Sequence, residues 1–84
     1  MNLETIKTKI RQIILENLTE VKEEDLTDNV ELFSLGLNSL NSVSLVLGLE
    51  ETFGFEFDMD EISYESFRAI ADITELVKSK ILAT

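Results

Sequence analysis

Apolar residues recur at three- and four-residue intervals through most of this 84-residue chain, and this spacing constrains the fold more than any other feature. It places apolar side chains on one face of an α-helix, whereas a half-buried strand would alternate polar and apolar residues. Only residues 55–64 alternate, and their acidic centre is more typical of a helix start. Because a chain this short builds one modest core, we predict a single all-α domain over residues 1–84.

The predicted architecture is a small bundle of three main helices and one short helix. The first helix spans about residues 3–17 behind a cap at Asn2, and the last covers about residues 69–82. The short helix is expected near residues 59–64. A long connection between the first two main helices, residues 19–38, contains apolar side chains and is therefore expected to pack across the helices. The predicted core consists of Ile10, Ile14, Leu45, Leu49, Phe53, Ile70, Ile73 and Val77.

The second main helix is predicted from Ser39 to about Thr52, with Asn38 as its N-cap and Gly54 as its C-terminal stop. Its apolar residues form two neighbouring sectors, which together are wider than the face that a surface helix buries in a small bundle. We predict that one sector lies in the core and that the other is partly exposed beside Ser39; alternatively, the long connection covers it. The core sector is Leu45, Val46, Leu49 and Phe53, and the exposed strip is Leu40, Val43 and Leu47.

The charges are unbalanced, with 17 acidic and 7 basic residues and a formal net charge of −10. No basic side chain occurs between Glu23 and Phe67, so the middle of the chain should present an anionic surface. Such a surface repels nucleic acid and anionic lipid and speeds encounters with basic proteins. We therefore expect basic protein partners and no nucleic acid, although acidic residues also keep small proteins soluble.

The residue types that are missing exclude several functions. The chain has no cysteine and no histidine, which removes disulfides, thiolate nucleophiles, the usual zinc sites and imidazole bases. We do not expect a hydrolase that uses Ser39, because the chain has no histidine and no Lys or Arg between Glu23 and Phe67 to act as its base. The Asp58-x-Asp60 pair does not open a calcium loop, because the expected glycine position holds Ser63. No apolar run reaches the ~20 residues of a membrane span, and no signal segment is evident, so we expect a cytoplasmic protein without membrane insertion.

Three segments stand in an informative order: Leu32-Phe33 followed by residues 35–40 (Leu-Gly-Leu-Asn-Ser-Leu), then residues 50–54, then residues 67–73. In this order, on an acidic chain of this size, they resemble the acyl carrier proteins and their relatives, the peptidyl and D-alanyl carrier domains. The resemblance covers almost the whole chain. It implies that Ser39 is the attachment point of 4′-phosphopantetheine, whose thiol holds an acyl or aminoacyl group as a thioester. The protein would then be a carrier and not an enzyme.

The sequence departs from the family pattern next to Ser39. The family usually has Asp before the modified serine, where this chain has Asn38, and it often has acids where this chain has Asn41 and Ser44. Asparagine caps a helix as well as aspartate does, but a charge-assisted contact to a transferase is lost. We therefore expect slower loading or a dedicated transferase. The resemblance implies an acyl carrier of fatty acid or specialised lipid or polyketide synthesis. The departures favour a specialised pathway, with client enzymes that differ from those of ordinary fatty acid synthesis.

The implied partners are a phosphopantetheinyl transferase and basic enzymes that activate or transfer acyl groups. We expect the carrier itself to be a monomer. Three readings stay open: an acyl carrier, a peptidyl or D-alanyl carrier, and an unmodified interaction subunit. The aliphatic core could admit an acyl chain or leave the cargo outside. The predicted partner-binding residues are Asn38, Leu40, Val43, Leu47, Glu50 and Glu51.

Overall fold

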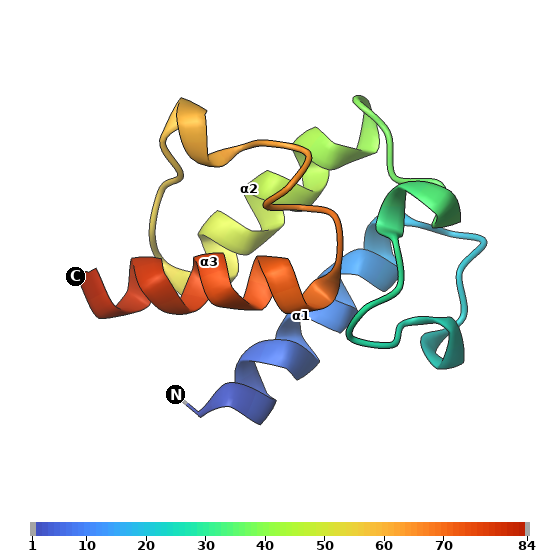
Figure 1. The fold of residues 1–84 in the computed structure, drawn as a ribbon, viewed down its shortest axis with the longest axis horizontal. Coiled ribbons are helices and arrows are strands. Elements are labelled where there is room, and N and C mark those ends of the chain that lie inside the picture. Colours follow the sequence, from blue (N-terminus) through green and yellow to red (C-terminus); the bar gives the residue numbers. More distant parts are fainter. Residues whose placement is uncertain (1, 84) are drawn as a thin grey trace.

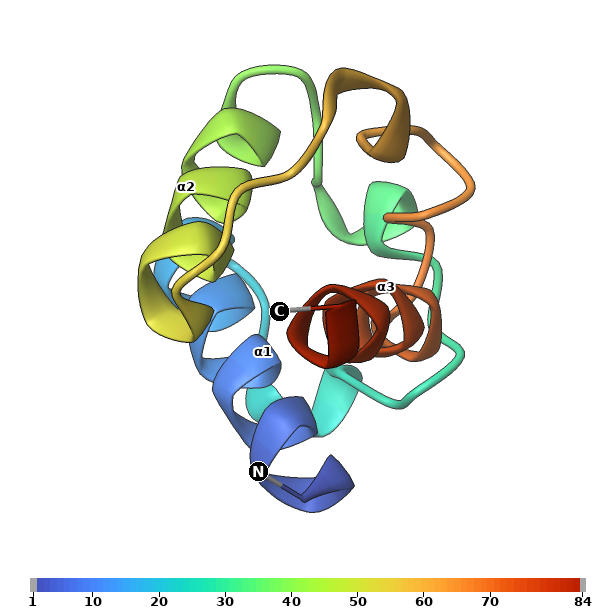
Figure 2. The same ribbon diagram turned by 90° about the vertical axis from the view of Figure 1, so that its left-hand side faces the viewer.

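The computed structural model describes residues 2–83, which form three α-helices joined by connections that contain short 3₁₀ helices (Figure 1). Helix α1 (Leu3–Asn17) packs against both α2 (Asn41–Phe53) and α3 (Ile70–Ala83). Figure 2 looks along α3 and shows α1 and α2 on the same side of it. No strand occurs among the described residues. The predicted all-α bundle of three main helices is therefore confirmed.

Helix α1 has the predicted bounds because both of its sequence signals, the cap at Asn2 and the apolar stripe, are local. The side chain of Asn2 accepts a hydrogen bond of 2.8 Å from the backbone N–H of Thr5, which satisfies one of the free donors at the helix start. The apolar stripe of α1 faces inward, and its buried members are Ile6, Ile10, Ile13 and Ile14. Seven of the eight predicted core residues are fully buried, and Phe53 packs against the core half-buried.

Helix α2 ends as predicted, whereas its assigned start differs. The chain leaves the helix through Gly54, whose φ of 74° is left-handed and whose N–H donates to the carbonyl of Glu50. The assigned helix begins at Asn41 and not at Ser39, because Ser39 and Leu40 form the turn between the cap and the regular helix. Helix α3 begins at Ile70, one residue later than predicted, with Phe67 buried just ahead of it.

A glycine lets α1 and α2 approach each other closely. A β-carbon added to Gly48 would lie 2.9 Å from the Cγ2 atom of Ile13, a residue of α1 that is 5% exposed. This is closer than carbon atoms pack without strain. The absence of a side chain at position 48 therefore sets the separation of the two helices at this point.

The long connection between α1 and α2 is fixed to both neighbouring helices. The carboxylate of Asp28 binds Lys7 at 2.7 Å and Arg11 at 2.6 Å, both on α1. Its carbonyl accepts from the N–H of Ala71 on α3, at 2.9 Å. Leu26, Leu32 and Leu37 bury their side chains in the core. The prediction that this segment packs across the helices is confirmed, and it contains two 3₁₀ helices that were not predicted, η1 (Glu23–Asp25) and η2 (Leu32–Leu35).

The connection between α2 and α3 contains the short helix that the sequence predicted near residues 59–64. It is a 3₁₀ helix, η3 (Met59–Glu61), shorter than expected. The carboxylate of Glu61 accepts hydrogen bonds from the backbone N–H of Asp58 at 2.7 Å and from Lys80 of α3 at 2.9 Å. These two bonds lower the pKa of Glu61 below its ordinary value, the first being the larger cause. They hold η3 against the end of α3.

Candidate functional site

Ser39 lies at the surface in the turn that leads into α2, and it is exposed. The N–H of Ser42 donates to the carbonyl of Asn38 at 2.9 Å, which is the first helical hydrogen bond of this region. Ser39 therefore occupies the first turn in terms of hydrogen bonding, although the regular helix begins at Asn41. Its hydroxyl has no hydrogen-bond partner among residues 2–83. A group attached to this oxygen would project into solvent.

Asn38 caps the start of α2, as its sequence position predicted. Its side-chain Oδ1 accepts hydrogen bonds from the N–H of Leu40 at 2.8 Å and of Asn41 at 3.1 Å. These are two of the backbone donors that a helix start leaves without an internal partner. Because both donors lie just after Ser39, the cap fixes the backbone on that side of the serine.

Asn41 has a structural role that sequence reasoning missed. Its Oδ1 accepts from the backbone N–H of Asn38 at 2.7 Å, and its Nδ2 donates to the carbonyl of Gly36 at 2.9 Å. Asn38 and Asn41 thus bond each other reciprocally, as the two side chains of a capping box do. The signal was present in the sequence, because the two asparagines stand three residues apart, the spacing of a capping box.

The exposed strip on α2 is confirmed. Leu40 is 84% exposed, Val43 59% and Leu47 54%, so the long connection does not cover them. A hollow of about 160 Å³ lies beside the strip, between α2 and the chain after η3, and it is lined by Ser42, Val43, Val46, Leu47 and Ile62. An apolar surface and a mostly apolar hollow therefore adjoin the turn that carries Ser39.

The two predicted rim acids have different environments. Glu51 is exposed, whereas Glu50 is half-buried and its carboxylate accepts a 2.8 Å hydrogen bond from the N–H of Phe57. Glu50 therefore fixes the connection that follows α2. A substitution at Glu50 would disturb this connection as well as any partner, so Glu51 is the rim acid that can be tested cleanly.

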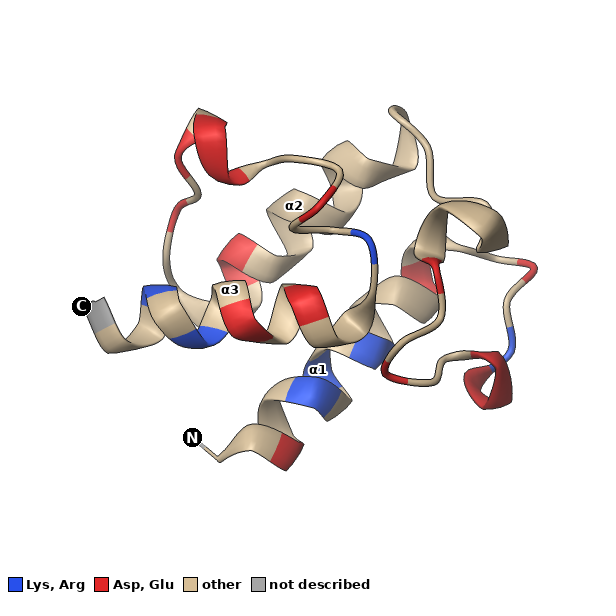
Figure 3. Ribbon diagram, viewed as in Figure 1, with Lys and Arg blue, Asp and Glu red and all other residues tan. Residues whose placement is uncertain are grey.

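The acidic surface stops short of Ser39. Residues 32–49 contain no ionisable side chain, and Figure 3 shows the turn before α2 and the first half of α2 without charge. The acids gather on η1, on the second half of α2 and around η3. The predicted anionic middle of the chain is therefore interrupted by residues 32–49, although Glu20 lines a hollow together with Gly36 and Asn41 of the turn that carries Ser39.

A contact between the two long connections lies close to the uncharged segment. The ring of Tyr64 stacks on Phe33 of η2 with 4.8 Å between centroids, and its hydroxyl donates to Glu31 at 2.5 Å. The hydrogen bond to Glu31 raises the pKa of Tyr64, since losing the proton would break it. This contact joins the connection before α3 to the one before α2.

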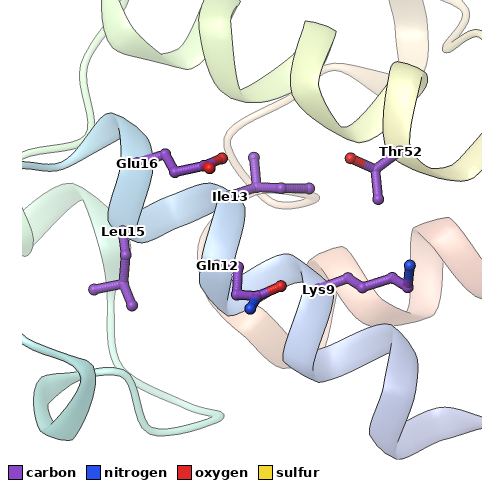
Figure 4. A pocket seen from close by; sticks show the side chains of 6 residues that line it. All are labelled: Lys9, Gln12, Ile13, Leu15, Glu16 and Thr52. Carbon is purple, nitrogen blue, oxygen red and sulfur yellow. The ribbon is translucent and has the colours of Figure 1, made fainter.

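A larger hollow lies away from the serine. It has a volume of about 460 Å³ and runs between α1 and the end of α2, where Lys9, Gln12, Glu16 and Thr52 surround Ile13 (Figure 4). Thr52 follows Ser39 by thirteen positions, which corresponds to about 20 Å along a helix. No group of three acidic side chains within residues 2–83 is placed to hold a metal ion, and no helix of that part of the chain is long and apolar enough to cross a membrane.

The surroundings of Ser39 fit the phosphodiester that the family resemblance implies. The hydroxyl is exposed, has no hydrogen-bond partner within residues 2–83, and lies at the start of α2, where the helix dipole is positive. The uncharged stretch of residues 32–49 places no carboxylate beside it. A negatively charged group attached here would therefore lie at the positive end of the α2 dipole and beside no acid of that stretch.

Comparisons with known proteins agree with this geometry. Residues 8–77 match the family described as "Phosphopantetheine attachment site". The chain is 30% identical to an acyl carrier protein of Coprothermobacter proteolyticus over 82 residues, 96% of either chain. It is 38% identical to an aminoacyl carrier protein of Agrobacterium fabrum over 55 residues, 66% of either chain.

A solved structure is similar as well. It is a chain in the crystal structure of an engineered Bradyrhizobium japonicum glycine:[carrier protein] ligase complexed with a carrier protein from Agrobacterium tumefaciens and AMP. The TM-score is 0.79 with 33% identity, over 86% of this chain and 97% of that chain. Since the family match spans far more than half of the sequence, the chain belongs to the phosphopantetheine-attachment family of carrier proteins, whose cofactor is 4′-phosphopantetheine.

Proposed function

We propose that this protein carries acyl intermediates as thioesters on a 4′-phosphopantetheine arm attached to Ser39. The observation that carries the proposal is the placement of Ser39, which is exposed, unbonded among the described residues and held at the start of α2 by the cap of Asn38. The arm supplies the thiol that this cysteine-free chain lacks. The protein contributes a rigid attachment point and a docking surface, and no catalysis of its own.

Attachment needs a second protein. The Ser39 oxygen forms the new bond to the phosphorus that carries pantetheine in coenzyme A. The bond from that phosphorus to the 3′,5′-adenosine diphosphate part breaks, this part leaves, and the serine proton has to reach a base. The Ser39 hydroxyl has no hydrogen-bond partner among residues 2–83, so we assign this base to the phosphopantetheinyl transferase. The same argument opposes a hydrolytic role for Ser39. A hydroxyl that bonds no base among the described residues supports a carrier, because the serine of a carrier stays unreactive until a transferase binds.

The exposed strip of Leu40, Val43 and Leu47 is the proposed docking surface. These side chains stand beside Ser39 and remain solvent-exposed in the free protein, which is unusual for a cluster of large apolar residues unless a partner covers it. Glu51 lies at the border of the strip and meets basic residues of the transferase and of the enzymes that load the arm. We expect the carrier to work as a monomer in the cytoplasm.

An aminoacyl cargo is the second candidate, because a 33% identical chain occurs in a structure of an engineered glycine:[carrier protein] ligase complexed with a carrier protein. The two cargoes differ in what the hollow beside α2 can accept. Each buried methylene contributes about 0.8 kcal/mol, whereas a buried, unpaired ammonium costs several kcal/mol. An acyl chain would therefore enter the hollow of about 160 Å³, and an amino acid would stay outside.

The mass of the intact protein, isolated from its source cells, tests the proposal. We expect one phosphopantetheine arm with an added group that hydroxylamine removes at neutral pH, since hydroxylamine cleaves thioesters. The mass lost identifies an acyl or an aminoacyl group. A protein that carries no arm under any growth condition would contradict carriage and favour an unmodified interaction subunit.

Thermal unfolding of loaded protein then locates the cargo. A chain that rests in the hollow binds the folded state alone and raises the melting temperature above that of the arm without cargo. An external amino acid leaves it unchanged. Equal melting temperatures for the unloaded and the acylated form would place the acyl chain outside the hollow.

A further inference from the structure

The turn that carries Ser39 is closed by two side-chain amides that meet at one carbonyl oxygen. Asn41 donates from Nδ2 to the carbonyl of Gly36 at 2.9 Å, and Asn38 donates to the same oxygen at 3.3 Å. Gly36 itself has a φ of 111°, a conformation that a residue with a β-carbon rarely adopts. We call Asn38, Asn41 and the Gly36 carbonyl the amide clamp. It joins the end of η2 to the start of α2.

The amide clamp holds the backbone on both sides of the serine. Before Ser39, the N–H of Asn38 donates to Oδ1 of Asn41 at 2.7 Å. After it, the N–H groups of Leu40 and Asn41 donate to Oδ1 of Asn38 at 2.8 and 3.1 Å. The Ser39 hydroxyl takes no part in these bonds and stays exposed. The residues on both sides of Ser39 are therefore held by hydrogen bonds of the amide clamp, whereas the Ser39 side chain is not.

Only a carboxamide can make this set of bonds. An aspartate at position 41 could still accept from the N–H of Asn38, but it has no donor for the carbonyl of Gly36. Its second oxygen would face that carbonyl, acceptor against acceptor. An alanine would make neither bond. The clamp also adds no charge, which is consistent with the uncharged stretch of residues 32–49.

We propose that Asn41, acting with Asn38 through the amide clamp, is a positioning residue for the modification of Ser39. The inference rests on the proposed function, since it concerns how readily the transferase finds the serine oxygen in reactive geometry. Asn41 touches no reacting atom. Its two hydrogen bonds restrict the turn before the transferase binds, so the cost of ordering the turn does not enter the transfer step.

The first experiment compares two aspartate variants in arm transfer from coenzyme A by a broad-specificity transferase. Asn41→Asp removes the donor to Gly36, whereas Ser44→Asp adds the same charge three residues further along α2, at an exposed position outside the clamp. One lost hydrogen bond of ordinary strength changes a rate by about 5- to 10-fold. Both variants gain the same charge near the docking strip, so the comparison between them isolates the lost donor. We expect kcat to be lower by this factor in Asn41→Asp than in Ser44→Asp. Equal kcat values in the two variants would overturn the proposal.

Hydrogen exchange of the unmodified protein supplies a readout that does not need the transferase. In Asn41→Ala the amide of Asn38 loses its acceptor, so its exchange should become roughly tenfold faster or more, while core amides such as that of Ile14 keep their rates. Equal acceleration of core amides would indicate a general loss of stability and contradict a positioning role. If the wild-type protein accepts no arm at all, the proposed function fails, and the exchange rate of Asn38 still decides whether the clamp exists.

Discussion

Single residues in this protein hold together segments that are far apart in the sequence. Asp28 is the clearest case, because its carboxylate binds Lys7 and Arg11 of α1 while its carbonyl binds the N–H of Ala71 at the start of α3. The pKa of Asp28 is lowered, and the hydrogen bond from Lys7 is the main cause. Burial acts in the opposite direction and raises the pKa, but the charges of Lys7 and Arg11 lower it further. This residue fixes the long connection whose end carries Ser39.

Asp28→Asn should lower the free energy of unfolding at pH 7 by about 1 kcal/mol, a value near the upper end for partly exposed pairs. Because the pKa is lowered in the folded state, the stabilisation is present above the ordinary value of about 3.9 and is lost as the pH falls through the folded value. Urea unfolding of wild type and variant at pH 7 and below about pH 4 measures this. The exposed acid Glu24 supplies the control Glu24→Gln. If wild type and Asp28→Asn differ in the free energy of unfolding by the same amount at both pH values, the ion-pair account is contradicted.

The roles of individual side chains could be predicted only where the partner is close in sequence. Asn38 caps N–H groups two and three residues away, so its role followed from its position before a helical pattern. Glu50 binds the N–H of Phe57, which no pattern in the sequence indicated. The sequence therefore predicted Glu50 only as a charge at the rim of the docking surface. Ser39 as the attachment point is still a prediction, and it came from the order of several segments together.

At the scale of elements, the helices could be predicted well because their end signals and apolar stripes are local. The 3₁₀ helices η1 and η2 could not, because three or four residues are too few to show a period. The long connection adopts them where it is anchored by contacts to α1 and α3. Packing between elements was also not visible in the sequence. Gly48 is an example, since a glycine inside a helical pattern predicts weaker helix formation and says nothing of the neighbour it approaches.

Gly48→Ala should destabilise the protein by about 1 kcal/mol, because overpacking costs about 1–3 kcal/mol and exceeds the gain of about 1 kcal/mol from better helix formation. The added carbon would lie 2.9 Å from Cγ2 of Ile13. In an Ile13→Ala background that atom is gone, so the same substitution should become stabilising. Urea unfolding of the four proteins measures the effect. An effect of Gly48→Ala with the same sign in both backgrounds would show that the close approach is not its cause.

The exposed face of α2 makes a second prediction at this scale. Leu47→Ala should weaken binding to the transferase by about 1–2 kcal/mol through faster dissociation, because a buried apolar anchor acts on residence time. Leu82, which is 75% exposed near the end of α3, provides the control Leu82→Ala and should leave binding unchanged. Glu51→Lys should slow association at low salt and have little effect at high salt. Surface plasmon resonance separates the rates, and equal effects of Leu47→Ala and Leu82→Ala would refute the proposed docking surface.

At the scale of the whole molecule, repulsion between like charges opposes folding. Seventeen acids and seven basic residues occupy a molecule with extents of 34 × 26 × 20 Å. Several of the basic residues form ion pairs, including those of Lys7, Arg11 and Lys80. The Debye length is about 30 Å at 0.01 M salt and about 8 Å at 0.15 M. Charges across the whole molecule therefore repel at low salt, and only near neighbours do so at physiological salt.

The melting temperature should rise when sodium chloride is increased from about 0.01 to 0.15 M, and magnesium should raise it further at equal ionic strength. Salt also weakens the ion pairs, but these are partly buried and less screened, so the relief of repulsion dominates. Differential scanning calorimetry at constant pH measures the shift. A melting temperature that falls or stays constant with added salt would contradict this electrostatic account.

The account as a whole depends on Ser39 being the site where the arm is attached. The most direct test is the intact mass of the full chain after incubation with coenzyme A and a broad-specificity transferase, for wild type, Ser39→Ala and the neighbouring-serine control Ser42→Ala. The account predicts one added phosphopantetheine on wild type and on Ser42→Ala, and none on Ser39→Ala. An arm that persists in Ser39→Ala, or a wild-type mass that never changes, would contradict it.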